Sequence, residues 1–444
     1  MKRILTIVLI AFFGCFSFRA LKHKDVYIVH DPALLMKRLV LVGKVNVPSE
    51  LAPIIPLYNA VITESGTASY TADQVKNTLK KYAAKFDFSL SEDGRLAAGF
   101  SCFSHGFSEV TRIFLEIIKS SNFDSDTVEM KKKILCENLR RNLEKPFNMA
   151  LIAVKHFLFS DDRILNCDTL LKFDRQDLIK FHNSLHFLDF RIITNFENFD
   201  ENTLLTHIKK KYGNQIGDSA KPTLNQSVVI WIWGPFDQYS TVLAAQSENL
   251  LSPKRYALRL FSSIISEDFD SLVFKKIRSE LGLAYVADAG WLADFKTGTI
   301  YLAVQHSADK LEEVLRIGFE IFHDVKSGAF DYSLLGNVIK REKRKLSFEK
   351  ERLFAFYVER SLKEVFGLPW NDQDLFLQFL ANQDHKTLVK KIGDVISLSR
   401  TSPFVLVVIG KEDPYPTLLK TFGPLFSQYR FVKARFDENF RLLY

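Results

Sequence analysis

Side chains that could do metal chemistry are sparse in this 444-residue sequence. His182 and His186 are the one histidine pair spaced four residues apart. On a helix, that spacing places both imidazoles on one face, where they can bind zinc while a Glu between them activates water. Here Asn183, Ser184 and Leu185 stand between them, so no base is supplied. We interpret the pair as surface or core histidines.

The cysteines offer no thiolate metal site. Cys15 falls in the predicted leader, and Cys102, Cys136 and Cys167 form no CxxC spacing and cannot all pair with one another. Their apolar neighbours favour small core residues for Cys102 and Cys136. The sequence therefore predicts neither a disulfide framework nor a metal bound by this chain.

An internal repeat indicates the elements that surround the remaining candidates. The segment 109–113 recurs 204 residues later as 313–317, and both copies have apolar residues at helical spacing. The same order of helix, hairpin, helix, turn and helix surrounds each copy. The predicted elements are helices near 72–84 and 271–281, hairpins over 86–103 and 283–304, and basic amphipathic helices near 130–143 and 334–348.

This repeat predicts an α+β fold with two homologous α/β sandwich lobes, each a mixed, mostly antiparallel sheet flanked by helices. We expect a secretory leader at 1–20, a first lobe at 21–215, a linker at 216–226 and a second lobe at 227–444. The linker carries Gly217, Ser219 and Pro222, which are typical of a connecting segment.

The N-terminal segment and the net charge indicate where the protein is located and which partners it could bind. Lys2 and Arg3 precede a short apolar run at 4–13, the form of a secretory leader, so we expect a bacterial periplasmic protein. Lipidation at Cys15 and a retained leader are two open routes to a membrane anchor. The net charge is +8, but basic residues are interleaved with acidic ones, and no nucleic-acid motif accompanies them. We therefore expect no nucleic-acid partner.

Three stretches resemble the pitrilysin/insulinase-type zinc peptidase family, which includes mitochondrial processing peptidase. The segment 64–67 resembles the Gly-Thr segment that follows the zinc helix in that family. The segment 132–146 resembles the helix with the third zinc ligand. The segment 274–285, which ends in Gly-Leu-Ala-Tyr, is similar to the family's second-lobe signature. The resemblance covers roughly residues 40–440.

The resemblance also shows what is missing. Active members carry HxxEH just before the Gly-Thr pair, and counting back from Gly66 puts Leu57, Ala60 and Val61 at those positions. None of these side chains can bind zinc or move a proton. Glu137 occupies the third ligand position, but one carboxylate cannot hold zinc, so we interpret it as an ordinary polar helix residue. We expect no cofactor in this chain.

The resemblance implies a role for Arg278 and Tyr285, seven residues apart. In the family this pair reaches the zinc site of the other lobe or subunit and donates hydrogen bonds to the substrate backbone and to developing oxygen charge. The implied function is a non-metal-binding subunit of a heterodimeric zinc peptidase, which hydrolyses nothing alone. An HxxEH-bearing partner would hold the zinc, and peptides would add as a strand to a sheet edge. The alternative is an inert structural or scaffold protein of the same fold.

Overall fold

The structure, a computed structural model, describes residues 20–23, 25–30, 34–160, 164–197, 224–266, 271–280, 282, 286–423 and 428–444. The predicted leader, apart from Ala20, and most of the predicted linker lie outside these ranges, so the domain boundaries remain predictions. Within the described ranges, no helix combines the length and the apolar character that crossing a bilayer requires.

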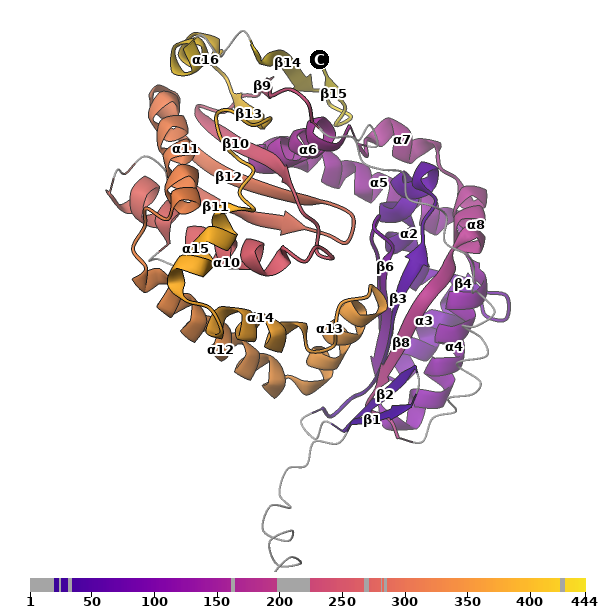
Figure 1. The fold of residues 1–444 in the computed structure, drawn as a ribbon. Coiled ribbons are helices and arrows are strands. Elements are labelled where there is room, and N and C mark those ends of the chain that lie inside the picture. Colours follow the sequence, from indigo (N-terminus) through magenta and orange to yellow (C-terminus); the bar gives the residue numbers. More distant parts are fainter. Residues whose placement is uncertain are drawn as a thin grey trace, which may run out of the picture.

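The first sheet is formed by strands of the N-terminal half (Figure 1). Among the described residues its order is β1 (Ala20–His23), β2 (Val26–Val29), β8 (His186–Thr194), β3 (Lys37–Asn46), β6 (Arg95–Cys102) and β5 (Lys85–Leu90). β2 runs parallel to β8, and the other neighbours pair antiparallel. In the β5–β6 turn, Gly94 has φ +87°, and an added Cβ would lie 2.2 Å from the carbonyl oxygen of Val45. Only glycine fits this turn.

The second sheet is formed by the C-terminal half and repeats this arrangement. Its order in the described part of the chain is β11 (Val286–Ala293), β12 (Gly298–Ser307), β10 (Gln238–Ser247), β13 (Val405–Gly410), β9 (Val228–Trp233), β14 (Arg430–Phe436) and β15 (Leu442–Leu443). Five neighbouring strands of this sheet have the same order and relative directions as five strands of the first sheet. The matched strands are β9 with β2, β13 with β8, β10 with β3, β12 with β6 and β11 with β5. The predicted α+β fold with two similar lobes is therefore confirmed.

The helices follow the repeated order as well. The first copy consists, in chain order, of α3 (Ala72–Lys81), the β5–β6 hairpin, α4 (Phe107–Ser120) and α5 (Ser125–Arg141). The second copy consists of a π-helix (Phe274–Glu280), the β11–β12 hairpin, α11 (Leu311–Ser327) and α12 (Ser333–Glu351). The side chain of Asp124 accepts a hydrogen bond of 2.9 Å from the amide of Thr127 and so caps α5. The helix predicted near 271–281 is a π-helix.

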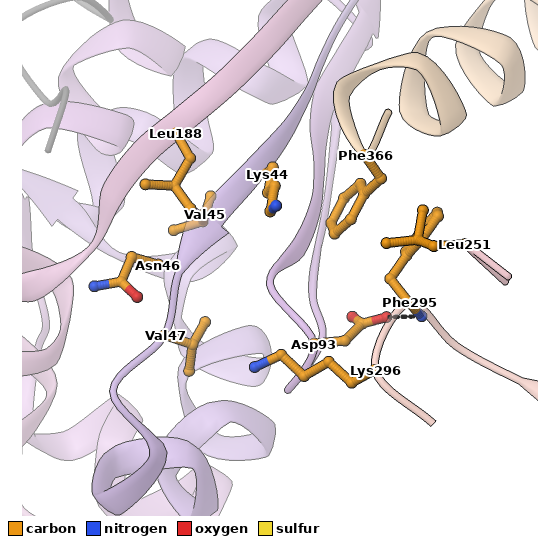
Figure 2. A pocket seen from close by; sticks show the side chains of 10 residues that line it. All are labelled: Lys44, Val45, Asn46, Val47, Asp93, Leu188, Leu251, Phe295, Lys296 and Phe366. Carbon is orange, nitrogen blue, oxygen red and sulfur yellow. Dashed lines mark hydrogen bonds between the residues drawn. The ribbon is translucent and has the colours of Figure 1, made fainter. Parts of the chain in front are cut away.

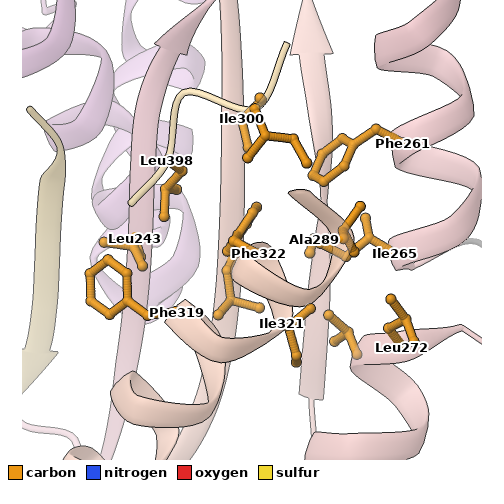
Figure 3. Close-up of a cluster of buried hydrophobic side chains, with 14 of the residues drawn as sticks. Leu243, Phe261, Ile265, Leu272, Ala289, Ile300, Phe319, Ile321, Phe322 and Leu398 are labelled. Carbon is orange, nitrogen blue, oxygen red and sulfur yellow. The ribbon is translucent and has the colours of Figure 1, made fainter. Parts of the chain in front are cut away.

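One face of each sheet packs against helices of its own half. The first sheet shares its core with α3, α4 and α5 and with α2 (Ile55–Val61), α7 (Cys167–Lys172) and α8 (Arg175–Ser184). The second shares its core with α11 and α12 and with α10 (Arg255–Ile265), α14 (Asp372–Ala381), α15 (His385–Gly393) and α16 (Tyr415–Phe422). Figure 3 shows part of this second core, which contains Phe261 of α10, Phe322 of α11 and Ile300 of β12.

The opposite face of each sheet is covered by a helix of the other half. α6 (Pro146–Phe159), which follows α5, shares a buried cluster with β9, β10, β13 and β14 of the second sheet. α13 (Leu353–Val365), which follows α12, buries Phe354 against Val42 and Ile193 of the first sheet. In Figure 1, α6 lies beside the second sheet, and α13 reaches the first sheet at the end of the arc formed by α12 and α14. The two halves therefore exchange equivalent helices.

Candidate functional site

The helix at the degenerate zinc motif, α2, is a core element. Leu57 and Val61 are 0 % exposed, and Ala60 is half-buried. Leu57 and Val61 belong to the first hydrophobic core, so no imidazole or carboxylate is presented where the motif would lie. Among the residues that the structure describes, no group of three or more His, Cys, Asp or Glu side chains could hold a metal ion.

The Gly-Thr segment after α2 has a structural role of its own. Gly66 and Thr67 form the short strand β4 (Gly66–Thr67), which pairs with β7 (Ser121–Asn122) at the end of α4. The hydroxyl of Thr67 donates to Glu116 over 2.8 Å and accepts from the amide of Tyr70 over 3.0 Å. An added Cβ at Gly66 would lie 2.7 Å from the carbonyl oxygen of Tyr70. These contacts position α3 against α4 and require no metal.

Glu137, at the third ligand position, lies on α5, which packs beside α2. Its side chain is exposed on the surface of that helix. The structure thus does not bring Glu137 together with other ligand types.

The structure places the two histidines of the pair on different elements. His182 lies near the end of α8, while His186 begins β8, so the two are not on one helix. His182 is buried, and its Nδ1 lies 2.8 Å from the hydroxyl of Tyr58 on α2. Burial raises the pKa of Tyr58 far above its usual value, so the phenol stays protonated while it shares this hydrogen bond with His182.

The sheet edge beside α2 is partly closed by Asn59, which the sequence did not single out. Its side-chain amide donates to the carbonyl of Leu90 over 2.9 Å and accepts from the amide of Leu90 over 3.0 Å. Leu90 ends the edge strand β5, whose alternate residues Phe86 and Phe88 also turn their backbone groups outward. Asn59 therefore makes the two hydrogen bonds that a neighbouring strand would make with Leu90 at one end of this edge.

Side chains also bond the backbone of the equivalent edge strand in the second lobe. The hydroxyls of Ser262 and Ser266, at the end of α10, accept hydrogen bonds from the amides of Trp291 (2.7 Å) and Ala289 (3.1 Å) of the edge strand β11. Closing an edge with side chains prevents unspecific strand pairing. The clue in the sequence was Asn59 itself, since Asn is a poor residue inside a helix unless its side chain has a backbone partner.

Arg278 lies on the π-helix of the second lobe and is exposed. Its guanidinium lies 5.1 Å from the ring centre of Phe274, which holds the side chain against its own helix. The neighbouring Ile277 is buried in the second core and anchors this turn. Tyr285 lies outside the described residues, so its distance from Arg278 stays a prediction.

A cavity of about 160 Å³ lies where the two equivalent hairpin turns meet (Figure 2). The carboxylate of Asp93, in the first hairpin, pairs with Arg95 at 2.8 Å and accepts from the amide of Phe295, in the second hairpin, over 3.4 Å. Phe295 stacks on Phe366 with 3.9 Å between ring centres. Residues of both lobes line this cavity. Neither the zinc-motif positions nor Arg278 line it, so the cavity is separate from the predicted site.

Comparison with known proteins agrees with this picture. Residues 172–340 match the family described as the peptidase M16 inactive domain. No curated protein sequence matches the chain. A peptidase M16 inactive domain from Pseudomonas fluorescens has a similar structure, with a TM-score of 0.77 at 16% identity over 90% of this chain and 99% of that one.

Two solved proteases share the fold. The periplasmic protease PqqL from Escherichia coli has a TM-score of 0.69 at 14% identity, over 87% of this chain but 44% of that one. A protease from Helicobacter pylori has a TM-score of 0.69 at 12% identity, over 88% and 98% of the two chains. The resemblance to the pitrilysin-type family, M16, is confirmed: the chain is similar to M16 inactive domains in sequence over residues 172–340 and in fold over most of its length, and it lacks the zinc motif.

Proposed function

We propose that this chain is the metal-free subunit of a heterodimeric zinc peptidase of the periplasm. A partner of the same family that carries HxxEH supplies the zinc and the general base. The observation that carries the proposal is an asymmetry between the lobes. Two of the three zinc-motif positions of the first lobe, Leu57 and Val61, are core residues, whereas Arg278 of the second lobe is exposed on its π-helix.

Arg278 and Tyr285 are the residues that this chain contributes to the reaction. The guanidinium and the phenol donate hydrogen bonds to the substrate backbone and to the oxygen that becomes negative when water attacks. The contact with Phe274 limits the freedom of Arg278 without consuming its hydrogen-bond donors. A donor that is already oriented loses less conformational entropy when the transition state forms.

The substrates are extended peptides, and the closed edge beside α2 favours the partner as the subunit that pairs with them. Because Asn59 takes both backbone groups of Leu90, a peptide strand on β5 could reach only the outward groups of Phe86 and Phe88. The predicted leader supports a periplasmic location, as does the likeness to PqqL, which is described as periplasmic.

The test is a reconstitution assay. The chain is purified alone and mixed with an HxxEH-bearing M16 subunit from the same genome, and a peptide library and the zinc content are measured. We expect hydrolysis only in the mixture and zinc only in the partner. Arg278→Ala should lower kcat of the mixture by about 10²-fold, as expected for the loss of one oxyanion donor. Tyr285→Phe should also lower kcat.

Arg112→Ala is the matched control. Arg112 is also exposed on a helix, with its guanidinium 5.5 Å from the ring centre of Tyr70, but it lies in the first lobe. Its removal should leave kcat unchanged. Full activity in both the Arg278 and the Tyr285 variants would instead favour the inert scaffold, and zinc-dependent hydrolysis by the chain alone would refute the proposal.

A further inference from the structure

Two of the three described cysteines lie against each other in the first core. Cys136 is on α5, and Cys167 begins α7; both are buried. The sulfur of Cys167 lies 3.6 Å from the carbonyl oxygen of Cys136. Burial raises the pKa of the Cys167 thiol to about 12, and the neighbouring Cys136 side chain raises it as well.

Cys102 is different. It lies on β6, it is buried, and burial alone raises the pKa of its thiol to about 11. No second thiol contributes to that shift. The sequence could not separate these cysteines, because their pairing depends on how α5 packs against α7.

We propose that Cys136 and Cys167 form a disulfide bond in the exported protein, while Cys102 stays a thiol. Both residues lie in one buried cluster where α5 packs on α7, and the sulfur of Cys167 reaches the backbone of Cys136. A disulfide needs two cysteines that lie this close in the fold. The predicted secretory leader would deliver the chain to a compartment where disulfides persist.

The chemistry is two successive exchanges with a disulfide oxidant, such as oxidised glutathione or a disulfide-bearing oxidoreductase. One cysteine thiolate attacks the oxidant, forms a mixed disulfide and releases one thiol. The second thiolate attacks the protein sulfur of that mixed disulfide and releases the other thiol. Two S–H bonds are lost and one S–S bond forms, so two electrons and two protons pass to the oxidant.

The timing follows from burial. A thiol whose pKa is raised to about 12 is almost never a thiolate near neutral pH, and only the thiolate reacts. The bond must therefore form before α7 docks on α5, during folding after export. Once the helices have packed, the oxidant no longer reaches the sulfurs.

The link would close a loop from 137 to 166, and this loop carries α6, the helix that covers the second sheet. On its other side, α7 is held by the C-terminal segment, because the amide of Cys167 donates to the carbonyl of Asn439 over 2.9 Å. The disulfide would thus fasten the crossing segment to the first core at both of its ends.

The test maps the thiols of the whole protein, folded in a glutathione redox buffer or exported to a bacterial periplasm. Free thiols are alkylated, and the protein is digested with trypsin without reduction. We expect peptides 134–140 and 164–172 to be joined, and peptide 96–112, which holds Cys102, to be alkylated. Separate alkylation of both 134–140 and 164–172 would overturn the proposal.

Variants and a second readout complete the test. Cys102→Ser should keep the link, whereas Cys136→Ser should abolish it and leave Cys167 alkylated. The oxidised wild type should unfold at a higher guanidinium concentration than the same protein reduced with dithiothreitol, because the link restricts the unfolded chain. Equal midpoints would show that no such restraint exists. This comparison needs no variant to fold.

Discussion

Tyr58 shows what has become of the helix where the zinc motif would lie. Its ring makes edge contacts with Phe88 and Phe181, and its hydroxyl bonds His182 inside the core. A fully buried polar pair is stabilising only while both partners are present. α2 is therefore maintained by packing and by hydrogen bonds of its side chains, among them the buried bond between Tyr58 and His182.

Tyr58→Phe should lower the free energy of unfolding by about 1–3 kcal/mol, because it leaves the Nδ1 of buried His182 without its hydroxyl partner. Urea titration followed by circular dichroism measures this loss. Tyr332→Phe is the control, since Tyr332 is exposed and should change the free energy of unfolding by less than about 0.5 kcal/mol. Equal midpoints for Tyr58→Phe and the wild type would contradict the prediction.

At the residue scale, the sequence predicted that the zinc-binding residues are missing, but it did not predict the tertiary contacts that the residues of α2 make. Leu57, Ala60 and Val61 can be read from the spacing to Gly66, because HxxEH is a local pattern. The partners of Asn59 and Tyr58 lie 31 and 124 residues away, so only the tertiary structure reveals them. The role of Arg278 with Tyr285 remains a prediction.

Among the elements, helices and hairpins were readable because hydrophobic periodicity is local. The hairpin predicted over 86–103 is β5 with β6, and the helix near 130–143 is part of α5. The same periodicity cannot separate an α-helix from a π-helix, which explains the difference at Phe274–Glu280. Nor can it tell against which sheet an apolar helix face is buried.

α13 offers a test of the exchanged helices. Phe354 is 5 % exposed and packs on the first sheet, whereas Phe348, near the end of α12, is 64 % exposed. Phe354→Ala should lower the free energy of unfolding by about 3–5 kcal/mol through lost burial and the remaining cavity. Phe348→Ala should change it by less than about 0.5 kcal/mol. Similar losses in thermal or urea unfolding of the two variants would count against this packing.

Polar contacts also hold α13 against the first sheet. Glu364 accepts hydrogen bonds from the hydroxyl of Tyr27 over 2.9 Å and from the guanidinium of Arg191 over 3.1 Å, both on strands of the first sheet. Half-buried charged pairs of this kind fix orientation more than they add stability. They join α13 to strands β2 and β8.

For the whole molecule, the exchange of α6 and α13 means that neither half can bury both faces of its own sheet. Cutting the chain between residues 210 and 211 tests this directly. Each half made alone should be unfolded or aggregated, because one sheet face would lie open to water. The two halves made together should form a complex that elutes like the intact chain in size-exclusion chromatography. A half that is monodisperse and folded by itself would contradict this expectation.

The exchange also governs how the protein can be made. α6 leaves the ribosome long before β13, and the first sheet must wait for α13 before its second face is covered. Folding lobe by lobe during synthesis is therefore impossible, and the growing chain keeps apolar surface open until nearly all of it exists. Such a chain depends on holding chaperones more than two independently folding domains would.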